Sequence, residues 1–394
     1  MGSIDEVYEK KLLDKLSDKM IDGFSAIAEK IRPGWRERNK SRIDEWKLMF
    51  YAFNRSIPGI IGLVLVIAYV IVALAGPYLA PFRYDIPLQF FDKNSYLAHP
   101  RTVISIPNSL LATKFGLTPG NHTLLLGGDD YGRDLWSRLL YGARTSFVVS
   151  ILVMAIGPWI GIIIGLVSGY YGGKVDELIM RITDMFLSFP GLILAIAFSA
   201  VLPTRISGFL SSHKTVASIL LKLFALQPQH VGAMSYLVSV IVALWLVWWP
   251  GYARLVRGMT LGARENLYVE AARALGIPTR WILLRHIFPN ILGPILVYIT
   301  LDFGGVILTE AGLSFLGVGA VPPIADWGRI IYDGSAYFPN AWWLVFFPGL
   351  AILLAVLGFN LIGDTLRDVL DPKTRRSIEF KVKKKPAAGG GAGQ

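Results

Sequence analysis

Two acidic residues stand inside an apolar segment that is long enough to cross a membrane. Asp302 and Glu310 both fall between Ile291 and Phe315, and about 20 apolar residues suffice for a transmembrane helix. A carboxylate is costly in hydrocarbon, so such residues almost always face a bundle interior or water and take part in function. We predict that they line a solute path or pair with polar groups of a neighbouring subunit. A proton relay is the alternative.

A second acidic cluster, Asp129, Asp130 and Asp134, has residue types that bind calcium. An EF-hand loop would need a glutamate eleven residues after Asp129, and Leu140 stands there. We therefore expect no metal site. A turn followed by a short helix on the outer side of the membrane is the preferred interpretation.

The sequence contains no motif of common enzymatic chemistry. No segment has the glycine-lysine spacing of a phosphate-binding loop, the zinc-protease pattern or the nucleophile-elbow pattern, and there is no cysteine. We predict a chain without catalytic residues and without a cofactor of its own. If ATP drives its function, ATP and Mg²⁺ bind to partner subunits.

Composition indicates a membrane protein. Only 17% of the 394 residues are charged and 53% are hydrophobic, whereas soluble domains carry about 25% charged residues. The pattern predicts an all-α integral membrane protein with six transmembrane helices. The expected spans are residues 56–82, 145–173, 185–204, 236–253, 291–315 and 335–363.

Basic residues set the expected orientation. Most of the 39 Lys and Arg lie in residues 1–55, 174–181, 254–290 and 367–385, and basic loops stay in the cytoplasm. This explains the net charge of +11 without nucleic acid. We expect a multi-pass protein of the cell (plasma or inner) membrane with both termini cytoplasmic and, because the first 55 residues are charged, no cleavable signal peptide.

The basic segment 264–290 connects two of these spans. It predicts a short helix that stops at Gly276 and Pro278, then a second short helix that stops at Pro289. Two short helices that meet at a glycine form a compact cytosolic loop, and neither crosses the membrane.

Within this loop, Glu270-Ala271-Ala272, three residues, Gly276, twelve residues and Pro289 follow one another. This order resembles the cytosolic "EAA" loop in permease subunits of ATP-binding cassette (ABC) importers, although Phe288 replaces the usual leucine. Residues 128–134 and 359–364 are similar to the dipeptide/oligopeptide branch of that family. The resemblance covers roughly residues 55–375.

The resemblance implies a type I ABC importer permease fold in which the loop is a coupling helix seated on an ATPase subunit. The implied coupling residues are Glu270, Ala271, Ala272, Arg273, Gly276 and Pro289. The implied partners are a homologous second permease, two ATPase subunits and an extracytoplasmic solute-binding protein. That last protein would contact Asp129, Asp130, Arg133 and Asp134.

The resemblance also implies a solute. Peptides are the family default, and oligosaccharides are carried by some relatives. Asp302 stands where relatives have a small residue, which suggests a role in solute preference. Two rival functions stay open: a proton-coupled secondary transporter that uses Asp302 and Glu310, and a membrane scaffold without transport activity.

The expected organisation has five parts. They are a cytosolic segment 1–55, the first span 56–82, an extracytoplasmic segment 83–142, a transmembrane domain 143–364 with an outer insertion 205–235, and a basic tail 365–394. Residues 12–31 have an amphipathic pattern that fits a helix on the membrane surface or one packed on the protein. Mixed charge favours packing. Glycines at 157, 161, 165 and 169 predict close helix packing within the subunit.

Overall fold

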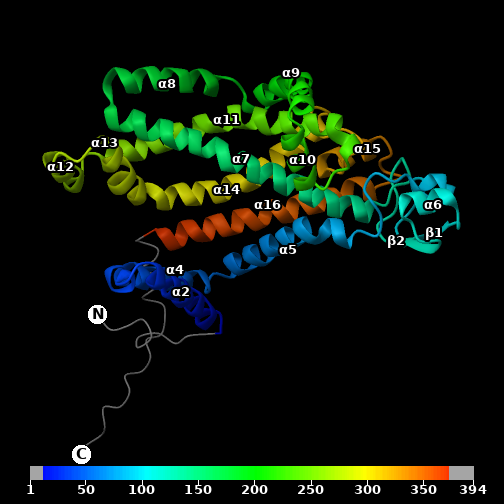
Figure 1. Cartoon of the computed structure of the whole chain (residues 1–394), viewed down its shortest axis with the longest axis horizontal. Helices are drawn as coiled ribbons and strands as arrows, with labels where there is room; N and C mark the ends of the chain where they lie inside the picture. Colours follow the sequence, from blue (N-terminus) through cyan, green and yellow to red (C-terminus); the bar gives the residue numbers. More distant parts are fainter. Residues whose placement is uncertain (1–11, 372–394) are drawn as a thin grey trace, which may run out of the picture. The chain divides into compact units, whose positions relative to one another are not determined.

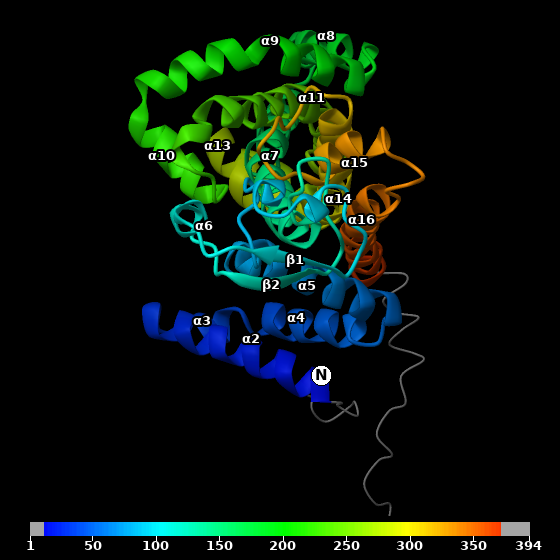
Figure 2. The same cartoon turned by 90° about the vertical axis from the view of Figure 1, so that its right-hand side faces the viewer.

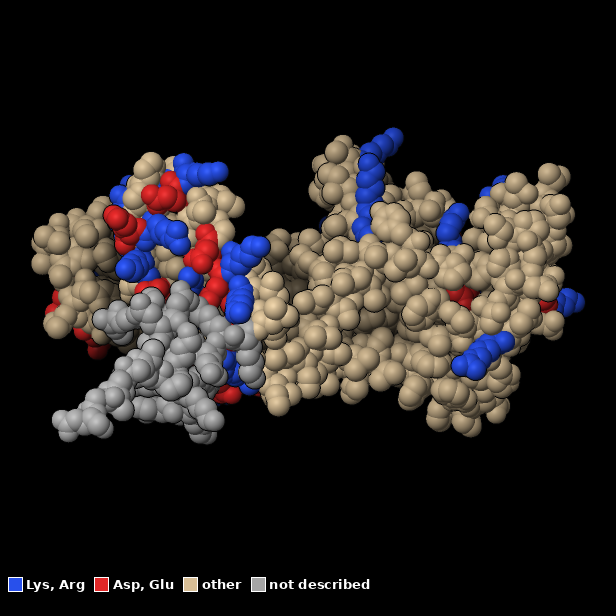
Figure 3. Space-filling view, turned by 90° about the horizontal axis from the view of Figure 1, so that it is seen from below, with Lys and Arg blue, Asp and Glu red and all other residues tan. Residues whose placement is uncertain are grey.

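The computed structural model describes residues 12–371 (Figure 1). Within these residues, six helical stretches are long and apolar enough to cross a membrane, which confirms the predicted number of spans. They are Ile57–Leu79, Leu135–Tyr171, Gly191–Ser212, Pro228–Ala263, Thr279–Phe315 and Trp343–Leu370. On the face drawn in Figure 3, a broad band over the spanning helices shows few charged side chains, as expected for a surface in lipid.

The described chain divides into two compact units. The small unit contains residues 12–64 and 358–371, and the large unit contains residues 65–357. Helices α5 (Ile57–Leu79) and α16 (Trp343–Leu370) each contribute residues to both units. Most of the predicted basic tail, residues 372–394, lies outside the described residues, as do residues 1–11.

Three long helices form the centre of the large unit: α7 (Leu135–Tyr171), α11 (Val231–Ala263) and α14 (Phe288–Phe315). The glycine series on α7 faces α11. A Cβ atom at Gly161 would lie 2.3 Å from the Trp249 carbonyl oxygen, and one at Gly165 would lie 2.6 Å from that of Ala253. The predicted packing within the subunit is confirmed, because only glycine allows the two backbones to approach so closely.

Two expected boundaries in the next region were wrong. The basic segment 174–181 is not a loop between two spans but belongs to helix α8 (Gly173–Ser188). The third span begins at Gly191, the first residue of α9 (Gly191–Ser212), and not at residue 185. Phe189 is extended because the proline that follows disfavours helical backbone. Part of the expected insertion 205–235 continues α9, and another part forms α10 (Lys214–Leu223).

A small subdomain precedes α7 (Figure 2). Strands β1 (Thr102–Ile106) and β2 (Gly120–Leu124) pair antiparallel with Ile104 opposite His122, and α6 (Leu110–Phe115) lies between them in sequence. Two 3₁₀ turns, Leu88–Phe90 and Lys93–Ser95, come before the strands. Its core contains Ile86, Leu88, Ile104, Ile106 and Leu124. We call residues 80–134 the hairpin region.

Helix α15 (Trp327–Ser335) precedes the last span, which starts at Trp343 and not at residue 335 as expected. An uncharged run need not be one helix, and Pro339 interrupts this one. A Cβ at Gly328 would lie 2.0 Å from the Ala311 carbonyl oxygen, and one at Gly142 would lie 2.7 Å from Cδ1 of Trp327. Helix α15 therefore packs closely on α7 and α14.

The small unit is built from α2 (Leu12–Ile31), α3 (Trp35–Arg38), α4 (Lys40–Phe53) and the ends of α5 and α16 that belong to it. Helix α2 packs on α4, as the packing interpretation of the N-terminal segment expected. A Cβ at Gly59 would lie 2.7 Å from Cγ2 of Thr365, which shows close contact between the first turn of α5 and α16.

Candidate functional site

The Glu-Ala-Ala loop, residues 264–290, projects beyond the ends of α11 and α14 (Figure 1). Its first helix, α12 (Leu267–Ala274), ends in a Schellman motif. The Ile277 N–H donates to the Ala272 carbonyl at 3.1 Å, and the Gly276 N–H donates to that of Arg273 at 2.9 Å. The predicted stop at Gly276 is therefore confirmed, and its φ of +71° is in the left-handed region that glycine allows.

One face of α12 is exposed. Glu270, Ala271 and Arg273 lie on it, with Leu267 and Leu275 about 80% exposed at its two ends. Ala272 does not share this surface. Together with Val269 it packs into the core of the large unit. Ala272, which the resemblance implied as a coupling residue, is therefore not available on the surface that a partner would contact.

The end of α7 is attached to this loop. The Arg273 guanidinium lies 4.9 Å above the Tyr170 ring, and its Nε donates to the Tyr170 hydroxyl at 3.3 Å. Arg264 Nη1 donates to the Gly169 carbonyl at 3.1 Å. Side-chain contacts therefore attach the loop to α7, in addition to its covalent connections to α11 and α14. The sequence analysis did not single out Tyr170, whose position at the end of an apolar run was its only signal.

Pro289 does not stop a helix, and this prediction was wrong. Residues 279–315 are helical throughout: α13 (Thr279–Trp281), a π-helical segment Ile282–Ile287, then α14. Proline lacks the N–H of a regular turn and its ring crowds the carbonyl four residues earlier. The wider π turn lies directly before the proline, and the helix continues through it.

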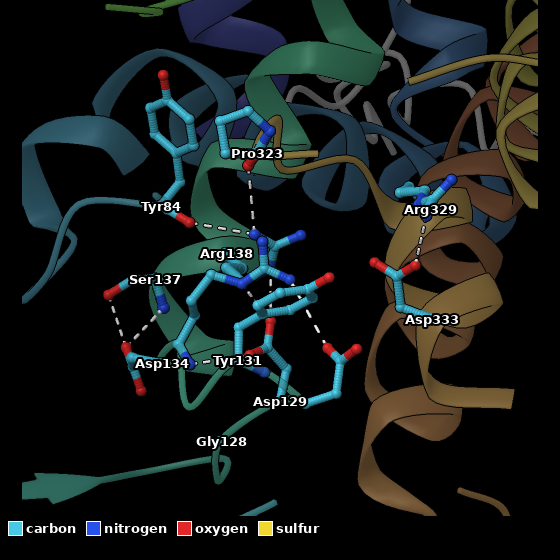
Figure 4. Close-up of polar contacts among 12 residues, drawn as sticks. Tyr84, Gly128, Asp129, Tyr131, Asp134, Ser137, Arg138, Pro323, Arg329 and Asp333 are labelled. Atoms are coloured by element: carbon cyan, nitrogen blue, oxygen red, sulfur yellow. Dashed lines mark hydrogen bonds and ion pairs between the residues drawn. The ribbon is translucent and has the colours of Figure 1, made fainter. Parts of the chain in front are cut away.

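The acidic cluster of the hairpin region forms a buried network with Arg133 and Arg138, of which Figure 4 labels Arg138. Asp129 Oδ2 accepts from Arg133 Nε at 2.7 Å and lies 3.3 Å from Arg138 Nε. Asp134 caps α7 by accepting from the Ser137 N–H at 2.8 Å. Arg138 Nη1 also donates to the Tyr84 carbonyl at 3.1 Å.

The side chains that were expected to contact an outer protein are already engaged in this network. Asp129, Arg133 and Asp134 are 3–4% exposed, so in this structure they hold the start of α7 against the hairpin region. Asp130 and Tyr131 are more exposed. An outer contact at this loop stays a prediction, with Tyr131 as its most accessible side chain.

Asp130 makes stability depend on pH. Burial, and next the charge of Asp129, raise its pKa from 3.8 to about 6. Between these values the unfolded chain releases a proton that the folded chain keeps, so folding stability falls as pH rises from 4 to 6 and stays lower above. We expect Asp130→Asn to raise the thermal midpoint at pH 7.5 but to change it little at pH 4. Tryptophan fluorescence during heating measures the thermal midpoint of the variant and the parent at each pH. An equal change in midpoint at both pH values would contradict the pH dependence assigned to Asp130.

Glu310 is fully enclosed within the chain. Its carboxylate accepts from Ser146 Oγ of α7 at 3.1 Å and from Ser314 Oγ at 3.4 Å, and it is within hydrogen-bonding reach of the buried Asp326 carboxyl. The Asp326 side chain also caps α15 by accepting from the Arg329 N–H at 2.8 Å. Glu310 thus connects α7, α14 and the start of α15, and a place in a solute path stays a prediction.

Asp302 lies deeper along α14 and is half-buried. Trp248 Nε1 of α11 donates to its carboxylate at 2.7 Å. The same tryptophan lines an apolar cavity of about 470 Å³ between α9, α11 and α14, with Leu192, Val247, Leu308 and Thr309. Asp302 and Glu310 therefore occupy separate environments, and Trp248 was the companion of Asp302 that the sequence analysis missed.

Six spanning helices, an exposed glycine-stopped helix between two of them and two internal acidic residues held by hydrogen bonds define the class: a helical multi-pass membrane protein. The sequence matches the family model "Binding-protein-dependent transport system inner membrane component" over residues 161–376. It also matches the "N-terminal TM domain of oligopeptide transport permease C" over residues 45–100.

Named relatives agree. The chain is 32% identical to the dipeptide transport system permease protein of Alkalihalophilus pseudofirmus over 86% of its length and 93% of the relative. It is 32% identical to the oligopeptide transport system permease protein of Bacillus subtilis over the same shares. It is 39% identical to the glutathione transport system permease protein of Pectobacterium atrosepticum over 64% of its length and 73% of the relative.

The chain belongs to the family of inner membrane components of binding-protein-dependent transport systems. It is a multi-pass membrane permease, a transport subunit and not an enzyme, with the type I ABC importer permease fold.

Proposed function

We propose that this permease imports peptides, as half of a transmembrane path completed by a homologous second permease. Two ATPase subunits dock on the cytoplasmic side, one of them on the Glu-Ala-Ala loop of this chain, and an outer solute-binding protein delivers the peptide. The observation that carries the proposal is the exposed face of α12. Glu270 and Ala271 are exposed on it at the tip of the loop, as is Arg273, which also contacts Tyr170. The chain belongs to a family whose named relatives transport dipeptides, oligopeptides and glutathione.

The proposed mechanism is mechanical. ATP and Mg²⁺ bind to the partner ATPases and supply the energy, and movement of these subunits displaces α12. The Schellman motif and the contacts of Arg264 and Arg273 with α7 keep α12 attached to the helices behind it. Helices α7, α11 and α14 then move together and change access to the path.

The proposal places the Glu-Ala-Ala loop and both termini in the cytoplasm and the hairpin region outside, in the plasma or inner membrane. The segment 254–290 is rich in arginine, which supports this orientation. Labelling of single cysteines placed in α12 and α6 with a membrane-impermeant reagent on intact cells tests it. Labelling at α12 but not at α6 would reverse the orientation.

Asp302 is the proposed determinant of solute preference, because its carboxylate lies beside the cavity that Trp248 lines. We expect Asp302→Asn to change the relative uptake of peptides of different charge by about tenfold, since one charge–charge contact at low dielectric is worth 1–2 kcal/mol or more. Competition uptake in proteoliposomes measures this, with Asp302→Glu as the control that keeps the charge. An unchanged ranking of peptides would contradict the role.

The test of the function is purification of the chain with its partners and measurement of ATP-dependent peptide uptake in proteoliposomes. We expect a second permease and ATPase subunits to co-purify, and uptake to require ATP and the binding protein. Uptake that is lost when the proton gradient is dissipated, and that does not depend on ATP, would favour the proton-coupled alternative through Asp302 and Glu310. Uptake of oligosaccharides but not peptides would correct the solute alone.

A further inference from the structure

An apolar stripe runs along α2 in the small unit. Leu13, Leu16, Met20, Phe24, Ile27 and Ile31 are 47–75% exposed. They recur every three or four residues and therefore share one side of the helix. We call these six residues the α2 stripe.

The stripe is not the side by which α2 packs on the protein. Its buried residues are Asp14, Ile21 and Ser25, and at 100° per residue these lie on a different side of the helix. Lys15, Lys19, Asp22 and Lys30 occupy the third side. Helix α2 thus has a packing side, a charged side and an apolar side that the described residues leave exposed.

A buried ion pair fixes the start of α2 at the membrane. The Asp14 carboxylate is 2% exposed and lies 3.1 Å from Arg55 Nη1, and it accepts from Asn54 Nδ2 at 3.1 Å. The first span begins at Ile57. Asp14 therefore lies at the depth where the chain enters the bilayer. Figures 1 and 2 together show α2 crosswise to the first turns of α5, not in line with them.

Aromatic residues continue the stripe onto α3 and α4. The Phe24 ring lies 6.2 Å from the Trp35 ring and 6.1 Å from the Trp46 ring, measured between centroids. Trp46 and Phe50 are exposed. Tryptophan favours the membrane–water boundary, where its ring meets acyl chains and its N–H meets water.

A basic sequence follows the stripe. Arg32, Arg36, Arg38, Lys40 and Arg42 are all exposed, with Glu37 the only acid among residues 32–43. Such side chains attract anionic lipid phosphates next to an apolar helix face.

We propose that α2 is an interfacial helix whose stripe lies between the headgroups and acyl chains of the bilayer leaflet that α5 enters. Lipid is the occupant because the stripe starts at the membrane entry point and continues into exposed tryptophan and a basic segment. The mixed charge that favoured packing is explained by the separate charged side of α2, and that side remains in water.

The chain contains no cysteine, so single cysteines can be placed without background. In the full chain reconstituted into liposomes with phosphatidylglycerol, a nitroxide label is attached at Leu16, Met20 or Ile27. Matched labels at Lys15, Lys19 and Lys30 report the charged side. Power saturation then compares collisions with oxygen, which concentrates in lipid, and with a water-soluble nickel chelate.

We expect the ratio of oxygen to nickel collisions to be several-fold higher at every stripe position than at its lysine control. Low collision rates with both reagents at the stripe would show a protein cover, such as a partner subunit, a second copy or residues 1–11, and would overturn the proposal. High nickel collisions there would show a water-exposed face and would overturn it too.

A second variant guards against a local effect of the label. With the label at Met20, Leu16→Asp and Ile27→Asp together should lower the oxygen-to-nickel ratio to that of the Lys19 control, because two carboxylates oppose insertion. Lys15→Asp and Lys30→Asp on the charged side should leave it unchanged. An unchanged ratio in the stripe variant would contradict insertion. The result does not depend on the solute or on ATP, so it can fail while the proposed function holds.

Discussion

Replacing Gly161 with leucine should leave no folded permease in the membrane. A Cβ atom at this position would lie 2.3 Å from the Trp249 carbonyl oxygen and 2.9 Å from the Ala253 backbone nitrogen. The atoms that would have to yield belong to the backbone of α11, so no rotamer change relieves the clash. Overpacking by one methylene costs about 1–3 kcal/mol where side chains can move, and here α7 and α11 would have to separate along their length. We expect even Gly161→Ala to lower the thermal midpoint by more than 5 °C.

The matched control for this prediction is Gly258→Ala on α11, where an added Cβ meets no atom within 4 Å. Alanine is about 1 kcal/mol better than glycine inside a helix, so this variant should fold normally. Detergent extraction followed by size-exclusion chromatography and thermal unfolding measures both variants. A monodisperse Gly161→Leu protein with the normal midpoint would show that the close approach of α7 and α11 does not exist.

Gly276→Val should abolish peptide uptake while the permease stays folded. Valine is poorly tolerated at φ +71°, and the left-handed conformation costs roughly 1–2 kcal/mol for a residue with a Cβ. The space around Gly276 is open, so the strain acts on the stop of α12 and not on the spans. A shifted α12 no longer presents Glu270 and Arg273 in register with a partner. We expect at least a tenfold loss of uptake per ATP hydrolysed and a midpoint within about 3 °C of the parent.

The variant Gly276→Asn tests whether Gly276 matters for its left-handed backbone conformation or for close contact with a partner. Asparagine tolerates the left-handed region, so this variant should retain most of the uptake if φ is what matters. Uptake and ATP hydrolysis by the same reconstituted complexes give the coupling ratio for all three proteins. Normal coupling in Gly276→Val would remove the Schellman stop from the mechanism, and an equal loss in both variants would assign the role of Gly276 to close contact with the partner.

The sequence predicted the six spans because an uncharged run of such length has one stable form in lipid, the helix that satisfies its own backbone. It could not predict where they end. Helix α7 starts at Leu135, before Arg138 and Arg144, although this span was expected to begin at residue 145. These cations are accommodated by acceptors far away in sequence, the Tyr84 and Leu223 carbonyls. No local pattern contains that information.

In the candidate site, too, local features could be predicted from the sequence and features that depend on tertiary packing could not. A glycine followed by a proline after a short helix is a local signal, and the stop at Gly276 follows from it. Which side of α12 faces the protein depends on how α7, α11 and α14 pack, and for that reason Ala272 was assigned to the wrong surface. The helix likewise continues through Pro289 because a π-helical segment precedes it, and no local sequence pattern predicted that segment. Tyr170, Trp248 and Asp326 were missed because each acts through a partner on another helix.

The attachments at the two ends of α7 have a thermodynamic consequence. At one end Asp134 and Arg138 bind it to the hairpin region, and at the other Tyr170 and Gly169 bind the Glu-Ala-Ala loop. The helix between them is 37 residues long, about 55 Å at 1.5 Å per residue. Under the proposed function, the ATPase subunit and the outer solute-binding protein bind on opposite sides of the membrane to regions that are both attached to α7. If ATPase binding changes the permease's affinity for the outer solute-binding protein by some factor, linkage requires that the outer protein change the permease's affinity for the ATPase by the same factor.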